Sequence, residues 1–168
     1  MALRSRNAQD LHGPPLGEWE ESKRVSLPGG GIMYVPATFT STTDLRAKDP
    51  LPKYRWRGEP GDGTIEVELI GYHRAMRLNR ARYSQTMKER IEEREGTILG
   101  DLETITVSGY ETLYGRYRLT HATYPTVVQF GAYARILTRN AGLLVAVEHP
   151  DPDRLDPFAK AVLATLVL

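Results

Sequence analysis

Short stretches in which apolar and polar residues alternate, separated by turn residues, take up most of this sequence. Residues 53–57 alternate strictly, and residues 64–72 place an apolar side chain at every second position. The segment between them, residues 58–63, contains three glycines and a proline and is typical of a turn. A period of two indicates a strand with one buried face. Strands joined by such short turns pair antiparallel, so the chain is predicted to build an antiparallel sheet.

Six more stretches fit this pattern. Residues 24–28 and 32–36 flank three consecutive glycines, which accept the backbone conformations of a tight reversal, and they are predicted to form a hairpin. The other four strands are expected at residues 102–108, 110–120, 126–138 and 142–149. Residues 37–52 are rich in Thr, Ser, Asp and Pro and indicate a loop.

The clearest helix is predicted over residues 79–96. Asn79 can cap its N-terminus and Gly96 can close it. Its apolar stripe consists of Tyr83, Met87 and Ile91, extended by Arg94. The charged run Lys88, Glu89, Arg90, Glu92, Glu93 and Glu95 is interpreted as a solvated outer face.

A second helix is predicted near the C-terminus, with Asp156 as its cap and Pro157 in its first turn. Its apolar stripe is Phe158, Ala161, Val162 and Leu166. The order of strands, helix, antiparallel strands and helix predicts an α+β fold, in which an antiparallel β-sheet is flanked by helices.

The length of 168 residues fits one domain. Residues 1–22 are predicted to be a flexible N-terminal arm anchored by Trp19, and residues 23–168 to be a single α+β domain. There is no cysteine, which excludes disulfides, thiolate metal sites and cysteine nucleophiles. There is also no apolar run long enough for a secretory leader or a transmembrane segment. The expected location is cytoplasmic for a complete chain, and periplasmic or envelope-attached for the mature form of an exported one.

No motif requires an enzyme. The four histidines lie in separate predicted elements, and none falls in a metal-binding or nucleophile motif. We therefore expect no catalytic residue, no metal and no cofactor. An enzyme remains the minor alternative, in which the fold would gather His73, His121 or His149 with an acid.

One basic segment stands out within a chain of net charge +1. The candidate binding residues there are Arg74, Arg77, Arg80 and Arg82, at and before the start of the first predicted helix. They could hold a phosphate, a carboxylate or an acidic partner. The alternative is that these arginines pair with Glu66, Glu68 and Glu103 on neighbouring elements. The small net charge argues against nucleic acid as a partner.

Aromatic residues give the other indication of a binding surface. Tyr114 and Tyr117 lie on one predicted strand at positions of opposite parity, so they face opposite sides of the sheet. At least one of them is expected on the second face, where a helix, a partner or a ligand would cover it.

In the order of its elements and in three local patterns, the chain resembles the PsbP-like superfamily, which includes DcrB-type lipoproteins and Eag-type chaperones of type VI secretion effectors. The matching stretches are residues 31–36, residues 83–111 and residues 142–168. Ala37, Thr38 and Phe39 stand where the family often has a Gly-Trp pair. The resemblance implies an α/β/α sandwich and a non-enzymatic binding or accessory role, and it transfers no catalytic residue.

Two functions follow as hypotheses. The first is a binding or accessory protein, alone or as a homodimer, that acts as a chaperone or adaptor for a secreted effector or an apolar segment. The second is a module of the cell envelope that binds a lipid or a small molecule.

Overall fold

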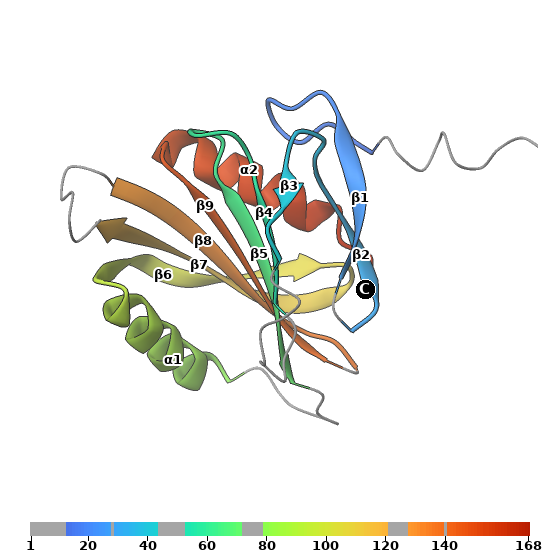
Figure 1. The fold of residues 1–168 in the computed structure, drawn as a ribbon. Coiled ribbons are helices and arrows are strands. Elements are labelled where there is room, and N and C mark those ends of the chain that lie inside the picture. The colour runs from blue at the N-terminus through green and yellow to red at the C-terminus, as the bar shows by residue number, and fades with distance from the viewer. Residues whose placement is uncertain (1–12, 28, 44–52, 72–78, 121–127, 140) are drawn as a thin grey trace, which may run out of the picture.

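The computed structural model describes residues 13–27, 29–43, 53–71, 79–120, 128–139 and 141–168. Seven of the described strands form one sheet in the order β3-β4-β5-β9-β8-β7-β6, and β1 and β2 form a separate ribbon (Figure 1). The strands are β1 (Ser22–Leu27), β2 (Gly31–Pro36), β3 (Thr40–Ser41), β4 (Lys53–Arg57), β5 (Thr64–Gly71), β6 (Gly96–Val107), β7 (Tyr110–Thr120), β8 (Val128–Leu137) and β9 (Gly142–His149). Every pairing within the sheet is antiparallel. The predicted α+β class with an antiparallel sheet is therefore confirmed.

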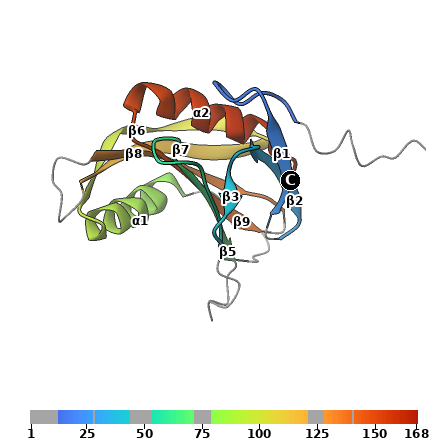
Figure 2. The same cartoon turned by 45° about the horizontal axis from the view of Figure 1, so that its top comes forward.

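The two helices lie on opposite faces of this sheet, α2 (Pro152–Ala164) on one and α1 (Arg80–Glu93) on the other (Figure 2). Successive side chains of a strand point to opposite faces of the sheet, so one set of alternate positions lies on the α1 side and the other on the α2 side. The face under α2 carries the larger core, which includes Ile65, Val67, Val145, Val147, Tyr114 and Phe158. The face under α1 carries a smaller cluster made of Met87, Ile91, Tyr117, Leu119, Tyr133 and Leu144.

Three aromatic rings join the N-terminal segment to α2. The ring centroids of Trp19 and Phe158 are 4.5 Å apart, and Phe39 lies 5.9 Å from Trp19 and 6.0 Å from Phe158. Leu16 is also buried, at 1% exposure. The arm expected over residues 1–22 is therefore packed onto the domain from Gly13 onward, because its apolar side chains complete the core. Residues 1–12 lie outside the described residues.

The first helix begins as predicted, with the Asn79 side chain accepting a hydrogen bond from the amide of Arg82 at 3.0 Å. Its end differs from the prediction. Glu95, with φ 59°, adopts the left-handed conformation, and Gly96 is already the first residue of β6. The strand expected from residue 102 starts six residues earlier because Gly96 pairs with Leu119 of β7, with an irregularity in register between Leu99 and Glu103.

The cap predicted for the second helix was wrong. Asp151, and not Asp156, accepts the capping hydrogen bond, from the amide of Asp153 at 2.9 Å, and Pro152 occupies the first helical position. Pro157 lies inside the helix, where it gives up one backbone hydrogen bond. Because the helix begins at Pro152, Leu155 lies within it and its side chain packs in the core.

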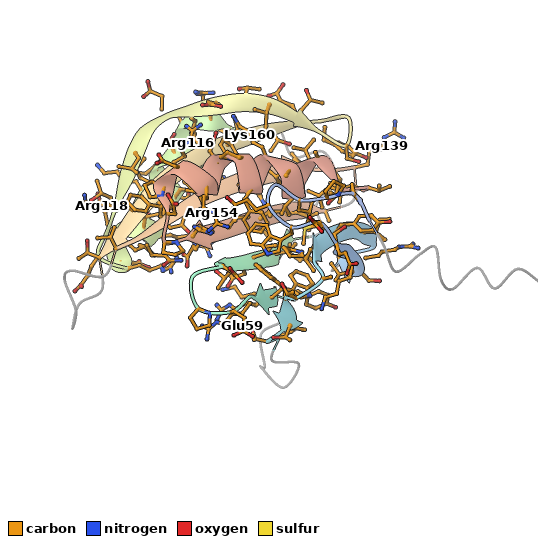
Figure 3. All side chains as sticks on the ribbon, turned by 90° about the horizontal axis from the view of Figure 1, so that it is seen from above. Glu59, Arg116, Arg118, Arg139, Arg154 and Lys160 are labelled. Carbon is orange, nitrogen blue, oxygen red and sulfur yellow. The ribbon has the colours of Figure 1, made fainter. Side chains whose placement is uncertain are left out.

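Asp156 instead lies in a cluster of charges between α2 and the sheet, next to Arg116 and Lys160, which are labelled in Figure 3. Its carboxylate accepts hydrogen bonds from the Tyr114 hydroxyl at 2.6 Å and from Arg116 Nε at 2.8 Å. Lys160 Nζ lies 3.3 Å away. Burial alone would raise the pKa of Asp156, but these partners lower it to about 2.

This cluster predicts a loss of stability in acid. The pKa of Asp156 is lowered from 3.8 in the unfolded chain to about 2 in the folded protein. The ionised carboxylate therefore contributes to the free energy of unfolding, and this contribution is fully present above pH 4 to 5. It is lost as the pH falls towards 2. Because the side chain is partly exposed, we expect a contribution of about 1–2 kcal/mol, which Asp156→Asn should remove. Urea unfolding of both proteins at pH 7 and pH 3 measures it: their difference in stability should shrink at pH 3, and a constant difference would contradict the assignment.

The β1–β2 ribbon is held by the C-terminal segment. Ile32 and Val167 exchange two backbone hydrogen bonds of 3.0 Å, and the amide of Tyr34 donates to Thr165 Oγ1 at 3.0 Å. The ribbon therefore docks onto the residues that follow α2.

Candidate functional site

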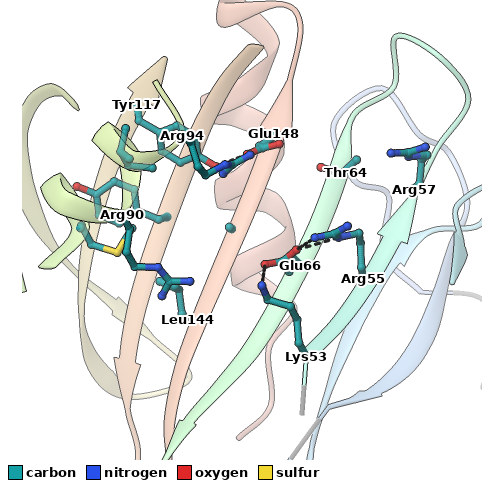
Figure 4. Close-up of a pocket in the computed structure, with 14 residues that line it drawn as sticks. Lys53, Arg55, Arg57, Thr64, Glu66, Arg90, Arg94, Tyr117, Leu144 and Glu148 are labelled. Carbon is teal, nitrogen blue, oxygen red and sulfur yellow. Dashed lines mark hydrogen bonds and ion pairs between the residues drawn. The ribbon is translucent and has the colours of Figure 1, made fainter. Parts of the chain in front are cut away.

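Helix α1 covers only part of its sheet face and leaves a cleft beside β4 and β5. Met87 and Ile91 pack on the side of β7, β8 and β9, where Tyr117, Tyr133 and Leu144 form the floor. The cleft has a volume of about 350 Å³ and lies between α1 and the strands β5 and β4 (Figure 4). A volume of this size is within the range of sites for small ligands.

Strand register explains which side chains reach the cleft. In β4 the odd positions Lys53, Arg55 and Arg57 face it, while Tyr54 and Trp56 pack against the core under α2. Across the sheet, one row runs from Arg57 through Thr64, Glu148 and Gly131 to Tyr117. The next row runs from Arg55 through Glu66, Ala146 and Tyr133 to Gly115.

The lining is strongly cationic. Its five cations are Lys53, Arg55 and Arg57 of β4 together with Arg90 and Arg94, which lie on or directly after α1. Its two acids are Glu66 and Glu148. In Figure 4 the two groups of cations lie on opposite sides of the cleft, with Arg57 and Arg94 towards the same end.

Glu66 is shared by two of these cations. Arg55 donates to its Oε2 from Nε at 2.8 Å and from Nη2 at 2.6 Å, and Lys53 Nζ lies 3.1 Å from its Oε1. Burial would raise the pKa of this carboxyl, but Arg55 and Lys53 hold it below its ordinary value. Glu66 therefore stays ionised and neutralises only one of its two partners.

Glu148 is held by two residues, Arg94 at the end of α1 and Tyr117 of β7. Arg94 Nη2 lies 2.8 Å from Glu148 Oε1, and the Tyr117 hydroxyl donates to the same oxygen at 2.7 Å. Burial and the adjacent carboxylate raise the pKa of Tyr117 well above its ordinary value, so the hydroxyl remains a donor. Among the described residues, Arg57 has no acidic partner within 4 Å, so this end of the cleft carries unbalanced positive charge.

Two glycines let the tyrosine rings lie flat along the floor. Gly131 is the cross-strand partner of Tyr117, and Gly115 that of Tyr133. A Cβ at residue 131 would lie 2.0 Å from the Tyr117 ring, and one at residue 115 would lie 2.5 Å from the Tyr133 ring. The two rings stack with centroids 5.9 Å apart. The floor is therefore an aromatic surface that needs glycine beneath it.

We expect Gly131→Ala to destabilise the protein by about 1–3 kcal/mol, because the added methyl displaces the Tyr117 ring. Unfolding in urea measures the effect. In a Tyr117→Leu background the same substitution should cost markedly less, since the smaller side chain leaves room. Equal costs in both backgrounds would show that the ring is not what excludes the methyl group.

The residues predicted to bind a ligand do not lie together in the structure. Tyr117 lines the cleft, whereas Tyr114 faces α2 and donates to Asp156. The two tyrosines thus face opposite sides, as their parity predicted. Arg80 donates to Thr104 Oγ1 and to the carbonyl of Leu102, and Arg82 is exposed in the first turn of α1. Neither lines the cleft, and Arg74 and Arg77 lie outside the described residues.

For Arg80 and Arg82, the described residues do not show the alternative pairing with Glu66, Glu68 or Glu103. Glu66 pairs with Lys53 and Arg55, and Glu68 pairs with Arg90. Glu103 pairs with Arg116 and Lys160. The interpretation of Arg90 as part of the solvated outer face was wrong. Its side chain turns towards the sheet, where Nη2 lies 2.9 Å from Glu68 Oε2 of β5. Arg94, expected in the apolar stripe, binds Glu148 instead.

Sequence reasoning missed the β4 cations, although their signal is visible. Residues 53–57 read Lys-Tyr-Arg-Trp-Arg, so one face of this strand is entirely basic. Of the histidines proposed for the enzyme alternative, His149 lies on the opposite side of β9 from Glu148, buried, with Nδ1 accepting from the Asp151 amide at 2.9 Å. Burial lowers its pKa. His73 and His121 lie outside the described residues.

In the part of the chain that the structure describes, no group of three His, Cys, Asp or Glu side chains could hold a metal ion. None of the helices in the same ranges is long and apolar enough to cross a membrane.

Comparison with solved structures assigns the architecture to the PsbP-like fold. The chain is similar to the solution structure of cyanobacterial PsbP (CyanoP) from Synechocystis sp. PCC 6803, with a TM-score of 0.64 and 11% sequence identity. The match covers 88% of this chain and 92% of that one. No protein-family model and no curated protein matches the sequence. At this identity the likeness concerns the fold, and it supports the fold part of the resemblance drawn from the sequence.

Proposed function

We propose that this protein is a non-enzymatic binding or accessory protein that holds an acidic segment of a protein partner in the cleft between α1 and β4. The excess of cations around the cleft carries this proposal. Arginines that face a carboxylate can form paired, charge-assisted hydrogen bonds, which are among the stronger polar contacts in proteins. Arg57 and one of the two partners of Glu66 are available for such contacts.

The spacing of the cations favours an extended segment. Successive outward positions of a strand such as Arg55 and Arg57 are about 6.8 Å apart. Arg90 and Arg94 are one helical turn apart, about 6 Å along the axis. An extended peptide with an acid at every second residue repeats with nearly the same distance, so its carboxylates could meet successive cations.

A role as chaperone or adaptor for a secreted effector or an apolar segment stays a prediction, as does a homodimer. Among the described residues, the large apolar side chains that are exposed are Leu99 and Val167, and neither lines the cleft. The chemistry of the cleft therefore supports an acidic rather than an apolar segment. The second candidate is an envelope module that binds a lipid or small molecule, and the small-ligand volume of the cleft favours it.

The test is a titration of the isotope-labelled protein with a peptide of alternating Glu and Ala, followed by amide chemical shifts. The matched control is the same peptide with Gln in place of Glu. We expect the Glu peptide alone to shift amides of β4, β5 and the second half of α1, more weakly at 0.5 M salt. Shifts elsewhere, or equal shifts with both peptides, would contradict the proposal. Binding of anionic lipid vesicles but not of the peptide would favour the second candidate.

A further inference from the structure

The last residue of β9, His149, is a buried histidine on the α2 side of the sheet, and it is 0% exposed. Its Nδ1 accepts a hydrogen bond from the backbone amide of Asp151 at 2.9 Å, so Nδ1 carries no proton and the neutral ring is protonated on Nε2. This Nε2 is shielded from solvent and has no hydrogen-bond partner among the described residues. Buried polar groups are nearly always paired, so a histidine at this position needs an explanation.

The amide that His149 binds belongs to the residue that caps α2. The Asp151 side chain accepts a hydrogen bond from the amide of Asp153 at 2.9 Å. Its carbonyl accepts from the amides of Arg154 and Leu155, each at 3.2 Å. Backbone amides in the first turn of a helix have no partner within the helix, and Asp151 supplies partners for three of them. The position of the Asp151 backbone therefore fixes the first turn of α2.

This first turn helps to hold the N-terminal segment. Cζ of Arg154 lies 5.7 Å from the centroid of the Trp19 ring, and the guanidinium pairs with Glu18. The Trp19 ring also packs on Phe158, one turn further along α2, with centroids 4.5 Å apart. Leu16 and Trp19 exchange two backbone hydrogen bonds of 3.0 and 3.1 Å, which close residues 16–19 into a turn. The segment 16–19 is thus docked on side chains that the beginning of α2 presents.

A second proton on His149 is incompatible with this arrangement. The proton would have to occupy Nδ1, because Nε2 already carries one in the neutral ring. The Nδ1–H group and the Asp151 N–H group would then be two donors 2.9 Å apart with no acceptor between them. Either the ring turns or the Asp151 backbone moves away, and both changes break the hydrogen bond next to the cap of α2.

The charged groups that act on the ring come from three parts of the fold. Burial has the largest effect and lowers the pKa of His149 from its ordinary value of 6.5, and Arg154 of α2 lowers it further. Asp151, which follows β9, and Asp62, in the turn before β5, act in the opposite direction. Because the unfolded chain takes up the proton more readily, the contribution of the neutral ring to stability is present above about pH 7. It is lost as the pH falls through the pKa of the folded protein.

We propose that His149 is a pH switch: when its ring takes up a second proton, its hydrogen bond to Asp151 breaks, the first turn of α2 loosens, and residues 16–19 are released from the helix. The release uncovers the apolar side chains of Leu16, Trp19 and Phe158. The switch lies on the face of the sheet opposite the cleft, so it does not depend on the ligand proposed there.

Nuclear magnetic resonance of the isotope-labelled protein tests the switch directly. At pH 7.5 the imidazole signals of His149 should show the proton on Nε2, and a titration should give a pKa below the ordinary 6.5. The amide signal of Asp151 and the indole N–H signal of Trp19 should change with the same midpoint. Below this midpoint, the protection of the Arg154 and Leu155 amides from hydrogen exchange should fall by about 2- to 10-fold, as expected when one hydrogen bond is lost.

The matched control is His149→Asn, which keeps an acceptor for the Asp151 amide and cannot take up a proton in this pH range. Its Asp151 and Trp19 signals should stay constant between pH 7.5 and pH 5. A proton on Nδ1 at pH 7.5, a Trp19 signal that does not follow the titration of His149, or the same pH dependence in both proteins would overturn the proposal. If the variant fails to fold, the titration of the unaltered protein still decides the question.

Discussion

Replacing Phe158 by alanine is expected to lower the free energy of unfolding by about 3–5 kcal/mol, the largest effect we foresee for a single side chain. Phe158 is 2% exposed and contacts both Trp19 and Phe39, so its removal leaves a cavity bounded by three separate parts of the chain. These parts are the N-terminal segment, the loop after β2 and α2. They cannot all close in on one void, so little of the loss should be recovered.

Urea denaturation followed by tryptophan fluorescence measures this effect, and Trp19 should report the change directly. Phe158→Leu serves as the graded control, with an expected loss of less than half as much. Leu99→Ala, at a side chain that is 37% exposed, should change stability by no more than about 0.5 kcal/mol. A similar loss for Phe158→Ala and Leu99→Ala would show that the three-ring cluster is not a centre of stability.

The second large effect concerns binding. The double variant Arg55→Gln/Arg57→Gln is expected to weaken binding of an alternating Glu–Ala peptide by about 10- to 100-fold at low salt, because two charge-assisted contacts are lost. Stability should change little, since Lys53 remains at 3.1 Å from Glu66 and Arg57 has no acidic partner among the described residues.

The matched control is Arg82→Gln/Lys88→Gln, which removes the same charge from the exposed side of α1. It should keep nearly the full affinity. If both double variants lost affinity equally, the peptide would be responding to net charge rather than to the cleft. Isothermal titration at two salt concentrations separates the two cases, because the cleft variant should also show a weaker dependence on salt.

Much of the fold could be predicted from local patterns. The period of two in β4 and β5 and the glycines between β1 and β2 each specify their element without help from distant residues. Element ends were harder to place. Asp151-Pro152 and Asp156-Pro157 both fit a cap followed by proline, and packing of Leu155 into the core decides for the first.

The cleft was less accessible to sequence reasoning. The basic face of β4 could be read from residues 53–57, but nothing local indicates that α1 would leave this face open. Arg90 and Arg94 gain their roles only from Glu68 and Glu148, which lie on strands that the tertiary fold brings beneath α1. Such partners cannot be assigned before the order of strands in the sheet is known.

The docking of the β1–β2 ribbon has a consequence for synthesis on the ribosome. Tyr34 bonds to Thr165, which follows it by 131 residues, and Ile32 is tied in the same way to Val167. At translation rates of about 5–20 residues per second, the ribbon waits on the order of ten seconds for these partners. During that interval its apolar residues, Met33 and Val35 among them, have no helix to cover them. A nascent chain stalled before α2 should therefore expose this hairpin to chaperones and proteases.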